Sequence, residues 1–423
     1  MMSYDQAIEY LNNRKVFGQK LGLERIEKLM LHLGNPQKQL RFVHIAGTNG
    51  KGSTSSFVFH ILKEAGLRVG LFTSPYIQRF SERIQVCDEE ITQDEIALIL
   101  SLIKRIVDVW DLDEEPTWFE MLTAMCFVHF RNKFCDIVVL EVGLGGDIDS
   151  TNVIDESEVS IITTINYDHM EILGNTLQEI AQKKAGIIKQ NGVVVVYPQD
   201  KDIIKVIENT ANSQAAKMAV VAEADIVPKT HTLQGQTFLY KNIEYNTKML
   251  GTHQVYNASV AIEAVHNLAN IDISTEQIQT GLTKTTWPGR MELLSTDPFF
   301  LLDGAHNIQG VINLIANIKI LFPNKKPIFI VGFLAHKEYK KMIEQTIPLA
   351  KSFIAVTPIN PKALNATELS DYIISQGATA THATSIDSAI DMAIDIARGE
   401  QDTFVCAFGS LYYIGLVRDY FGL

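Results

Sequence analysis

The 423-residue sequence has few cysteines and lacks any long uninterrupted apolar run. Its four cysteines are scattered, which predicts neither a zinc site nor a disulfide framework and favours a reducing compartment. A membrane helix needs about 18–20 consecutive apolar residues, and no segment approaches that length. The first residues also lack the basic start and apolar core of an export signal. We therefore expect a soluble cytoplasmic protein.

Basic residues are in the minority as well, with 37 Lys and Arg against 49 Asp and Glu, a formal net charge of −12. This balance argues against a nucleic-acid binder, because a phosphate backbone needs a basic face. It argues equally against attraction to an anionic membrane surface. A small anionic ligand in a locally positive pocket stays compatible with it. The length predicts at least two domains, since single domains commonly have about 100–150 residues.

Short apolar strands alternate with helical segments along most of the chain, after a helical region over the first 40 residues. The first group of predicted strands covers 42–45, 69–72, 137–142, 160–165 and 193–196. This alternation predicts a P-loop-type, doubly wound, mostly parallel sheet. Residues 217–250 read as an antiparallel excursion, and a new β-α-β alternation follows a break at 286–290. We expect domains at 1–288 and 289–423, the second a smaller Rossmann-like α/β domain.

A glycine-rich loop follows the first predicted strand and opens a helix, in the sequence HIAGTNGKGS from His44 to Ser53. In that context, backbone N–H groups converge on an anion at the helix N-terminus, and Lys51 adds a positive charge. The strict pattern G-x-x-x-x-G-K-[ST] is not met, because Ile45 replaces its first glycine and Gly52 separates Lys51 from Ser53. The alternative is an ordinary strand–turn–helix joint. We predict that ATP phosphates bind at Thr48, Asn49, Gly50, Lys51, Gly52 and Ser53.

The GTNGKGS loop resembles the variant found in the Mur ligase superfamily, and further motifs narrow the resemblance to folylpolyglutamate synthases. These motifs occur in order along nearly the whole chain. They are Gly22–Ile26, Leu33–Pro36, Thr73–Tyr76, Phe80–Ile84, Glu141–Gly146, Asp149–Asn152, Asp168–His169, Lys184–Ile187, His253–Gln254, Asn257–Ala258, Trp287–Arg290, Asp303–Asn307 and Gly409–Tyr412.

The resemblance implies a tetrahydrofolate:L-glutamate γ-ligase of folate and one-carbon metabolism. In this reaction ATP phosphorylates a folate carboxylate, and the glutamate amine attacks the acyl phosphate with release of ADP and phosphate. The resemblance also implies adenine, phosphate and ribose contacts by Asn257, Arg290 and Asp303, so that ATP would bridge both domains. His306 is expected to bind glutamate or act in catalysis; the alternative is a helix-capping or core histidine.

Two Mg²⁺ ions are implied, held by Ser74, Glu141, His169 and Lys184. Glu141 ends an apolar strand, at the sheet edge where doubly wound folds bind ligands. Imidazole is an unusual ligand for so hard a cation, so the role of His169 rests on the resemblance alone. The resemblance further implies that Lys184 is carbamylated, which requires a lysine with a lowered pKa. Taken by itself, Lys184 beside Lys183 reads as a solvated lysine face.

The folate site is expected between Ser74 and Arg83 and at the start of the helix near 119. Its predicted residues are Tyr76, Phe80, Arg83, Phe119 and Glu120. Tyr76 and Asp147 stand where bifunctional relatives, which also make dihydrofolate from dihydropteroate, commonly carry His and Arg. That second activity is the alternative reading. The resemblance leaves open a need for a monovalent cation, and we expect a monomer.

Three other readings are disfavoured. A peptidoglycan-precursor ligase would need a domain of roughly 100 residues before the loop, and Gly47 leaves no room for it. A GTPase-like switch would need a guanine-reading Asn-Lys-x-Asp motif, which the sequence does not contain. A catalytically inactive binding module would not be expected to keep Lys51, Glu141, His169 and Lys184.

Overall fold

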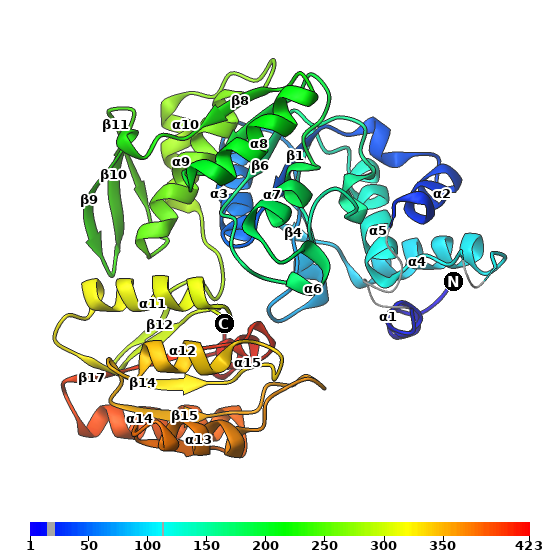
Figure 1. Ribbon diagram of the computed structural model, residues 1–423. Helices are drawn as coiled ribbons and strands as arrows, with labels where there is room; N and C mark the ends of the chain where they lie inside the picture. The colour runs from blue at the N-terminus through cyan, green and yellow to red at the C-terminus, as the bar shows by residue number, and fades with distance from the viewer. Residues whose placement is uncertain (15–21, 112–113) are drawn as a thin grey trace. The chain divides into compact units, whose positions relative to one another are not determined.

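The computed structural model describes residues 1–14, 22–111 and 114–423. The chain divides into two compact units, of which the first comprises 1–226 and 256–285 and the second 227–255 and 286–423 (Figure 1). The chain passes between the units in the segments around 226, 255 and 285. The domain boundary at 288/289 stays a prediction. The part of the predicted N-terminal helical region at 15–21 lies outside the described residues.

The first unit is built on an eight-stranded sheet whose central strands are parallel. In spatial order its strands are β4 (Glu89–Glu90), β3 (Ile84–Val86), β2 (Val69–Phe72), β5 (Ile137–Glu141), β1 (Phe42–Ala46), β6 (Val159–Ile162), β7 (Val193–Val196) and β8 (Lys217–Val220). Strands β1, β2 and β5 are buried throughout, as expected for parallel strands covered on both faces. Only β3 and β4, at one edge, pair antiparallel.

Helices surround this sheet. They are α1 (Tyr4–Asn12), α2 (Glu24–His32), α3 (Lys51–Glu64), α4 (Gln93–Val107), α5 (Trp118–Asn132), α6 (Met170–Leu173), α7 (Leu177–Ala185), α8 (Lys201–Ser213), α9 (Thr252–His266) and α10 (Thr275–Lys284), with short 3-10 helices η1 (Pro36–Gln39), η2 (Phe80–Arg83), η3 (Ser150–Val153) and η4 (Glu223–Asp225). Helix α3 packs on β1, β2 and β5, and α10 packs on α3.

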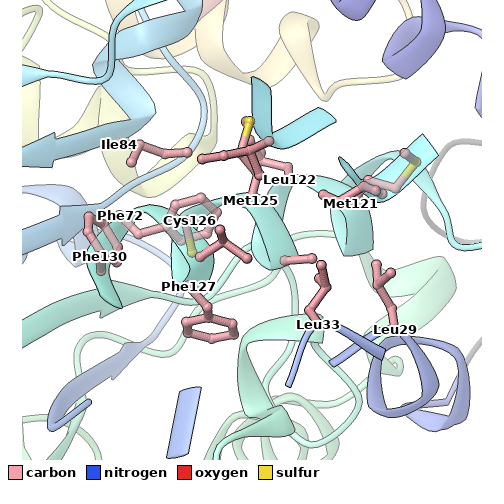
Figure 2. Packing of buried hydrophobic residues seen from close by; sticks show 14 of the residues in the cluster. Leu29, Leu33, Phe72, Ile84, Met121, Leu122, Met125, Cys126, Phe127 and Phe130 are labelled. Atoms are coloured by element: carbon pink, nitrogen blue, oxygen red, sulfur yellow. The ribbon is translucent and has the colours of Figure 1, made fainter. Parts of the chain in front are cut away.

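Helix α5 belongs to the hydrophobic core that also contains Phe42 of β1, Phe72 of β2 and Val138 of β5. Its residues from Phe119 to Phe130 are buried, and Figure 2 shows Phe130 beside Phe72 in this cluster of apolar side chains. Because α5 is apolar and buried over most of its length, it is a core helix, and its N-terminal turn is the part that lies next to the predicted folate residues. That turn holds Trp118, Phe119 and Glu120.

The second unit contains a six-stranded sheet in the order β12 (Glu292–Thr296), β13 (Phe299–Leu302), β17 (Thr403–Phe408), β14 (Lys326–Val331), β15 (Ser352–Ala355) and β16 (Ala380–His382). All pairs except β12–β13 are parallel. Its helices are α11 (Ile308–Leu321), α12 (Tyr339–Thr346), α13 (Ala366–Ser375), α14 (Ile386–Gly399) and α15 (Leu411–Tyr420). The predicted combination of a doubly wound sheet with a second, smaller α/β sheet is confirmed.

The antiparallel excursion is shorter than predicted. Its three strands, β9 (Ile226–Thr232), β10 (Gly235–Tyr240) and β11 (Ile243–Thr247), form a separate sheet. The segment 217–220 does not belong to it, because β8 pairs in parallel with β7 at the edge of the large sheet. The mixed polar and apolar residues of β8 follow from its edge position, since an edge strand is half exposed and does not read as a buried run.

Candidate active site

The glycine-rich loop leaves the carboxyl end of β1 and is anchored on the segment after β6. Thr48 N donates to Thr164 O at 2.7 Å, and the Thr48 hydroxyl donates to Asn166 O at 3.1 Å. Gly50 caps α3 in the left-handed region with φ 87°, and a Cβ there would lie 2.7 Å from Asn257 Oδ1. Asn257, on α9, therefore lies directly against the loop. Thr164 and Asn166 were not found from the sequence, because no local pattern marks them.

Two lysines converge on one carbonyl of this loop. Lys51 Nζ donates to Gly47 O at 3.1 Å and to Thr48 O at 3.4 Å, and Lys184 Nζ donates to Gly47 O at 2.8 Å. Lys184 is buried, whereas the Lys183 side chain is 41% exposed and pairs with Asp147 at 3.0 Å. The reading of Lys184 as part of a solvated lysine face is therefore wrong: the last turn of α7 points one lysine inward and its neighbour outward.

Burial lowers the pKa of Lys184 to about 7, and the positive charge of Lys51 acts in the same direction. The carboxylates of Asp168 and Asp149 oppose this shift without cancelling it. A neutral amine is consequently accessible at Lys184 near neutral pH, which a solvated lysine does not offer. Lys51, and Lys184 when it is protonated, place positive charge beside the glycine-rich loop in a chain of net negative charge.

Glu141 and Ser74 meet at the carboxyl ends of neighbouring strands. Glu141 ends β5 with a buried side chain, and its Oε2 accepts a hydrogen bond from Ser74 N at 3.0 Å. His169 is the N-cap of α6, with φ 49° and a side chain that is 45% exposed. Its ring nitrogens lie 3.9 Å from a carboxylate oxygen of Asp168 and of Glu171.

These donors suit a hard divalent cation only as part of a larger ligand set. A buried carboxylate and a hydroxyl-bearing residue supply oxygen, which Mg²⁺ prefers, while the imidazole of His169 is less suited. Across the described ranges 1–14, 22–111 and 114–423, no group of three or more His, Cys, Asp or Glu could hold a metal ion. Mg²⁺ commonly binds through one or two carboxylates together with substrate phosphates, so the residues fit that kind of site.

An aromatic cluster surrounds Arg83 beyond Ser74. The Arg83 guanidinium lies 4.9 Å from the ring centre of Tyr76 and 5.1 Å from that of Trp118, and the side chain is buried. Phe80 meets both rings edge to face, at 6.3 Å and 6.4 Å between ring centres. The structure thus brings together three of the predicted folate residues and adds Trp118.

Phe119 and Glu120 lie in the same first turn of α5. Phe119 packs against Phe72 at 6.0 Å between ring centres. The Glu120 carboxylate accepts from Thr117 N at 2.7 Å and forms a two-point ion pair with Arg25, at 2.9 and 3.2 Å. Glu120 therefore holds α2 and the start of α5 together. Arg25 lies in the Gly22–Ile26 motif but was not among the predicted site residues, because its pairing with Glu120 depends on the packing of α2 against α5.

The other predicted residues lie in the second unit. Asp303 is buried, and its oxygens accept from Met291 N at 2.9 Å and Ala305 N at 2.8 Å. Burial raises the Asp303 pKa, and the charge of Arg290 opposes that shift. His306 Nδ1 donates to Gly304 O at 2.9 Å, which leaves Nε2 as the proton-accepting atom of the neutral ring.

A helix long and apolar enough to cross a membrane is not found in the described part of the chain.

Comparison with protein families matches residues 45–265 to the Mur ligase middle domain and 289–411 to the Mur ligase glutamate ligase domain. A dihydrofolate synthase/folylpolyglutamate synthase of Bacillus subtilis is 38% identical over 428 residues, covering 98% of both chains. A folylpolyglutamate synthase of Lacticaseibacillus casei is 34% identical, covering 86% of this chain and 87% of that protein.

Solved structures agree. Mycobacterium tuberculosis folylpolyglutamate synthase complexed with ADP and AMPPCP aligns with a TM-score of 0.91 at 28% identity, over 99% of this chain and 98% of that one. The Thermotoga maritima folylpolyglutamate synthase aligns with a TM-score of 0.87 at 29% identity, over 99% and 96%. The expected family is confirmed: the chain is a Mur ligase of the folylpolyglutamate synthase/dihydrofolate synthase family.

Proposed function

We propose that this chain is an ATP-dependent, ADP-forming ligase that joins L-glutamate to the γ-carboxyl of tetrahydrofolate and its polyglutamates. The observation that carries the proposal is the convergence of Lys51 and buried Lys184 on Gly47 O. It occurs in a chain whose relatives, aligned over most of its length, are named folylpolyglutamate synthase. Nucleotide use is supported by the solved relative complexed with ADP and AMPPCP.

The proposed reaction has two steps. A folate carboxylate oxygen attacks the γ-phosphorus of ATP, the bond to the β-γ bridging oxygen breaks, and an acyl phosphate and ADP form. The amine of glutamate then attacks the acyl carbon, loses a proton, and phosphate leaves with the C–O bond electrons. Each step gathers negative charge, which the loop N–H groups and the lysines beside the loop would stabilise. We assign phosphate binding to residues 48–53 and to Arg290, adenine and ribose contacts to Asn257 and Asp303, and proton transfer or glutamate binding to His306.

We propose Mg²⁺ as the metal, with Glu141 and Ser74 as the protein ligands beside the phosphates and His169 and Lys184 at a second ion. When bound, Mg²⁺ neutralises charge on the phosphoryl oxygens. The Glu141 carboxylate is suited to this role because it is buried and held in place by Ser74 N.

We further propose that the Lys184 amine captures CO₂ as a carbamate. A pKa of about 7 supports this, because only the neutral amine is nucleophilic and a pKa near ambient pH supplies it. The modification replaces a buried positive charge by a negative one next to Lys51, which the neighbouring ammonium group would stabilise.

The folate site is assigned to the aromatic cluster around Arg83. Tyr76, Phe80 and Trp118 offer ring faces and edges for a pterin, and Phe119 and Glu120 lie in the adjoining turn. A monomeric state and a cytoplasmic location remain predictions that accompany this assignment.

A second activity, dihydrofolate synthesis from dihydropteroate, is favoured by one observation. The 38% identical relative bears both names. Against it, Asp147 is paired with Lys183 at 3.0 Å, so the position where bifunctional relatives commonly have arginine carries the opposite charge here.

One assay tests both activities. Purified protein, ATP, Mg²⁺ and glutamate are offered tetrahydrofolate in one reaction and dihydropteroate in another, and products are identified by mass. Glutamylated tetrahydrofolate with matching ADP release supports the main proposal, and dihydrofolate in the second reaction adds the second activity. Absence of glutamylated product in both reactions would overturn the proposed function.

A further inference from the structure

A chain of buried polar groups links the core strand β1 to the loop that follows β5. His44 Nε2 lies 2.9 Å from Thr151 Oγ1, and Thr151 Oγ1 lies 2.6 Å from Asp149 Oδ1. Asp149 Oδ2 in turn accepts from Leu144 N at 2.8 Å. His44, Asp149 and Thr151 are all fully buried, so each polar atom of the chain depends on its protein partner.

The direction of these hydrogen bonds follows from the groups themselves. Burial raises the pKa of Asp149, and hydrogen bonds donated by Leu144 N, Thr151 N and the Thr151 hydroxyl oppose that rise. The Thr151 hydroxyl therefore donates its proton to Asp149 Oδ1, and Thr151 Oγ1 accepts a hydrogen bond from His44 Nε2. His44 accordingly carries its proton on Nε2, and its buried Nδ1 has no hydrogen-bond partner among the residues that the structure describes.

The loop held in this way touches two parts of the candidate site. A Cβ on Gly143 would lie 2.4 Å from Cζ of Phe119, and a Cβ on Gly146 would lie 2.8 Å from Lys184 O. Asn152, at the far end of the loop, donates through Nδ2 to Gly186 O at 3.2 Å. The loop thus lies in direct contact with the predicted folate turn of α5 on one side and with the end of α7 on the other.

We infer that His44 is a positioning residue for folate: through Thr151 and Asp149 it holds the loop 143–152 in the place that orients Phe119. The inference rests on the proposed function. His44 itself, in the middle of β1 and fully buried, makes no contact with solvent and acts only through this chain of hydrogen bonds.

Steady-state kinetics of three variants test the role. His44→Phe keeps the ring shape without the N–H, and Thr151→Val removes the hydroxyl at equal volume. Both are expected to raise KM for tetrahydrofolate about tenfold while KM for ATP stays within twofold, since groups that orient a site commonly matter at this level. Thr151→Ser keeps the hydroxyl and should retain the wild-type KM.

Ser160→Ala is the matched control. Ser160 is the β6 residue paired with His44, is buried, and donates to Ile187 O at 3.0 Å, outside the chain of hydrogen bonds. Loss of the Ser160 hydroxyl should lower the melting temperature of the protein without changing KM for folate. An equal rise of KM in Ser160→Ala would mean that any buried polar loss has this effect, and would overturn the inference.

The tautomer gives a readout independent of activity and of variant folding. In ¹⁵N-histidine-labelled wild-type protein, His44 should show a protonated Nε2 and an unprotonated Nδ1 at neutral pH. A proton on Nδ1 would overturn the inference. So would folded His44→Phe and Thr151→Val variants with wild-type KM, whereas wild-type protein without ligase activity would overturn the proposed function as well.

Discussion

Lys51 Nζ and Lys184 Nζ donate hydrogen bonds to the same carbonyl oxygen, Gly47 O, at 3.1 and 2.8 Å. The two lysines come from the start of α3 and the end of α7, so this one backbone atom joins the phosphate loop to the buried amine. Because two positive charges lie near each other, the more buried one is the easier to neutralise, and that is Lys184.

Removal of the buried amine should abolish ligation without unfolding the chain. Lys184→Ala is expected to lower kcat by at least about a hundredfold, the range seen when an electrostatic group of an active site is deleted. Small carboxylic acids such as acetate should restore part of the activity if the group acts as a carbamate. Lys183→Ala, the exposed neighbour, is the control and should keep most of its activity. Near-wild-type turnover in Lys184→Ala would contradict the assignment.

The same lysine should make stability depend on pH in a defined window. Between about 7 and 10.5 the unfolded chain holds a proton on Lys184 that the folded chain has lost, so the free energy of unfolding of the wild type rises with pH there. Lys184→Met, which carries no charge, should therefore be more stable than the wild type at pH 7, and the difference should shrink toward pH 10.

Urea unfolding in carbonate-free buffer measures this difference, since added bicarbonate would modify the amine. Lys183→Met serves as the control, because an exposed ion pair contributes little, about 0–1 kcal/mol, and should give no such convergence. A stability difference between wild type and Lys184→Met that is constant from pH 7 to 10 would rule out a lowered Lys184 pKa.

The charge of Glu141 should matter more than its hydrogen bond. Glu141→Gln keeps an oxygen that can accept from Ser74 N but loses the negative charge that a cation requires. We expect the Mg²⁺ concentration for half-maximal rate to rise at least about tenfold, with a lower kcat at saturation. Initial rates over a Mg²⁺ titration provide the measurement.

Glu158→Gln provides the comparison for that titration. Glu158 precedes β6 and pairs with Arg41 at 2.7 Å, beyond the opposite ends of the strands. Its Mg²⁺ dependence should match the wild type. If the two variants respond alike, Glu141 has no specific role at the metal.

Much of the fold could be predicted from local pattern, and the reasons are physical. Strands β1 and β5 are short apolar runs because they are buried on both faces, and the loop is marked by Gly47 and Gly50, whose φ values of 151° and 87° favour glycine. Strand β8 was assigned to the wrong sheet, since an edge strand lacks that apolar signature.

The site's inner contacts could not be predicted in the same way. The inward direction of Lys184 depends on where α7 packs, and its partner Gly47 is 137 positions away along the chain. His44 and Thr151 are 107 positions apart, and a histidine within a strand carries no local sign of a hydrogen-bonded network. Such contacts arise from tertiary packing, which the periodicity of apolar residues along the sequence does not reveal.

Close packing of Gly146 against backbone atoms of α7 yields the last prediction. A Cβ there would lie 2.7 Å from Lys183 O, 2.8 Å from Lys184 O and 3.0 Å from Lys184 Cα, all of them backbone atoms that cannot rotate away. Gly146→Ala must therefore displace the end of α7 or the loop, with a cost of about 1–3 kcal/mol for overpacking. We expect kcat to fall more than tenfold, because Lys184 moves with its backbone.

Gly399→Ala is the control that shows the effect of an added methyl group at a glycine where no atom is displaced. A Cβ at Gly399 would meet nothing within 4 Å, and the residue ends α14 of the second unit. The substitution should leave kcat unchanged and, by restricting the unfolded chain, stabilise the protein by about 0.4–1 kcal/mol. Chemical denaturation and single-turnover rates of both variants provide the measurement. A fully active Gly146→Ala enzyme would mean that the position of Lys184 tolerates a shift of several tenths of an ångström, and that the tight packing of the loop against α7 serves stability rather than ligation.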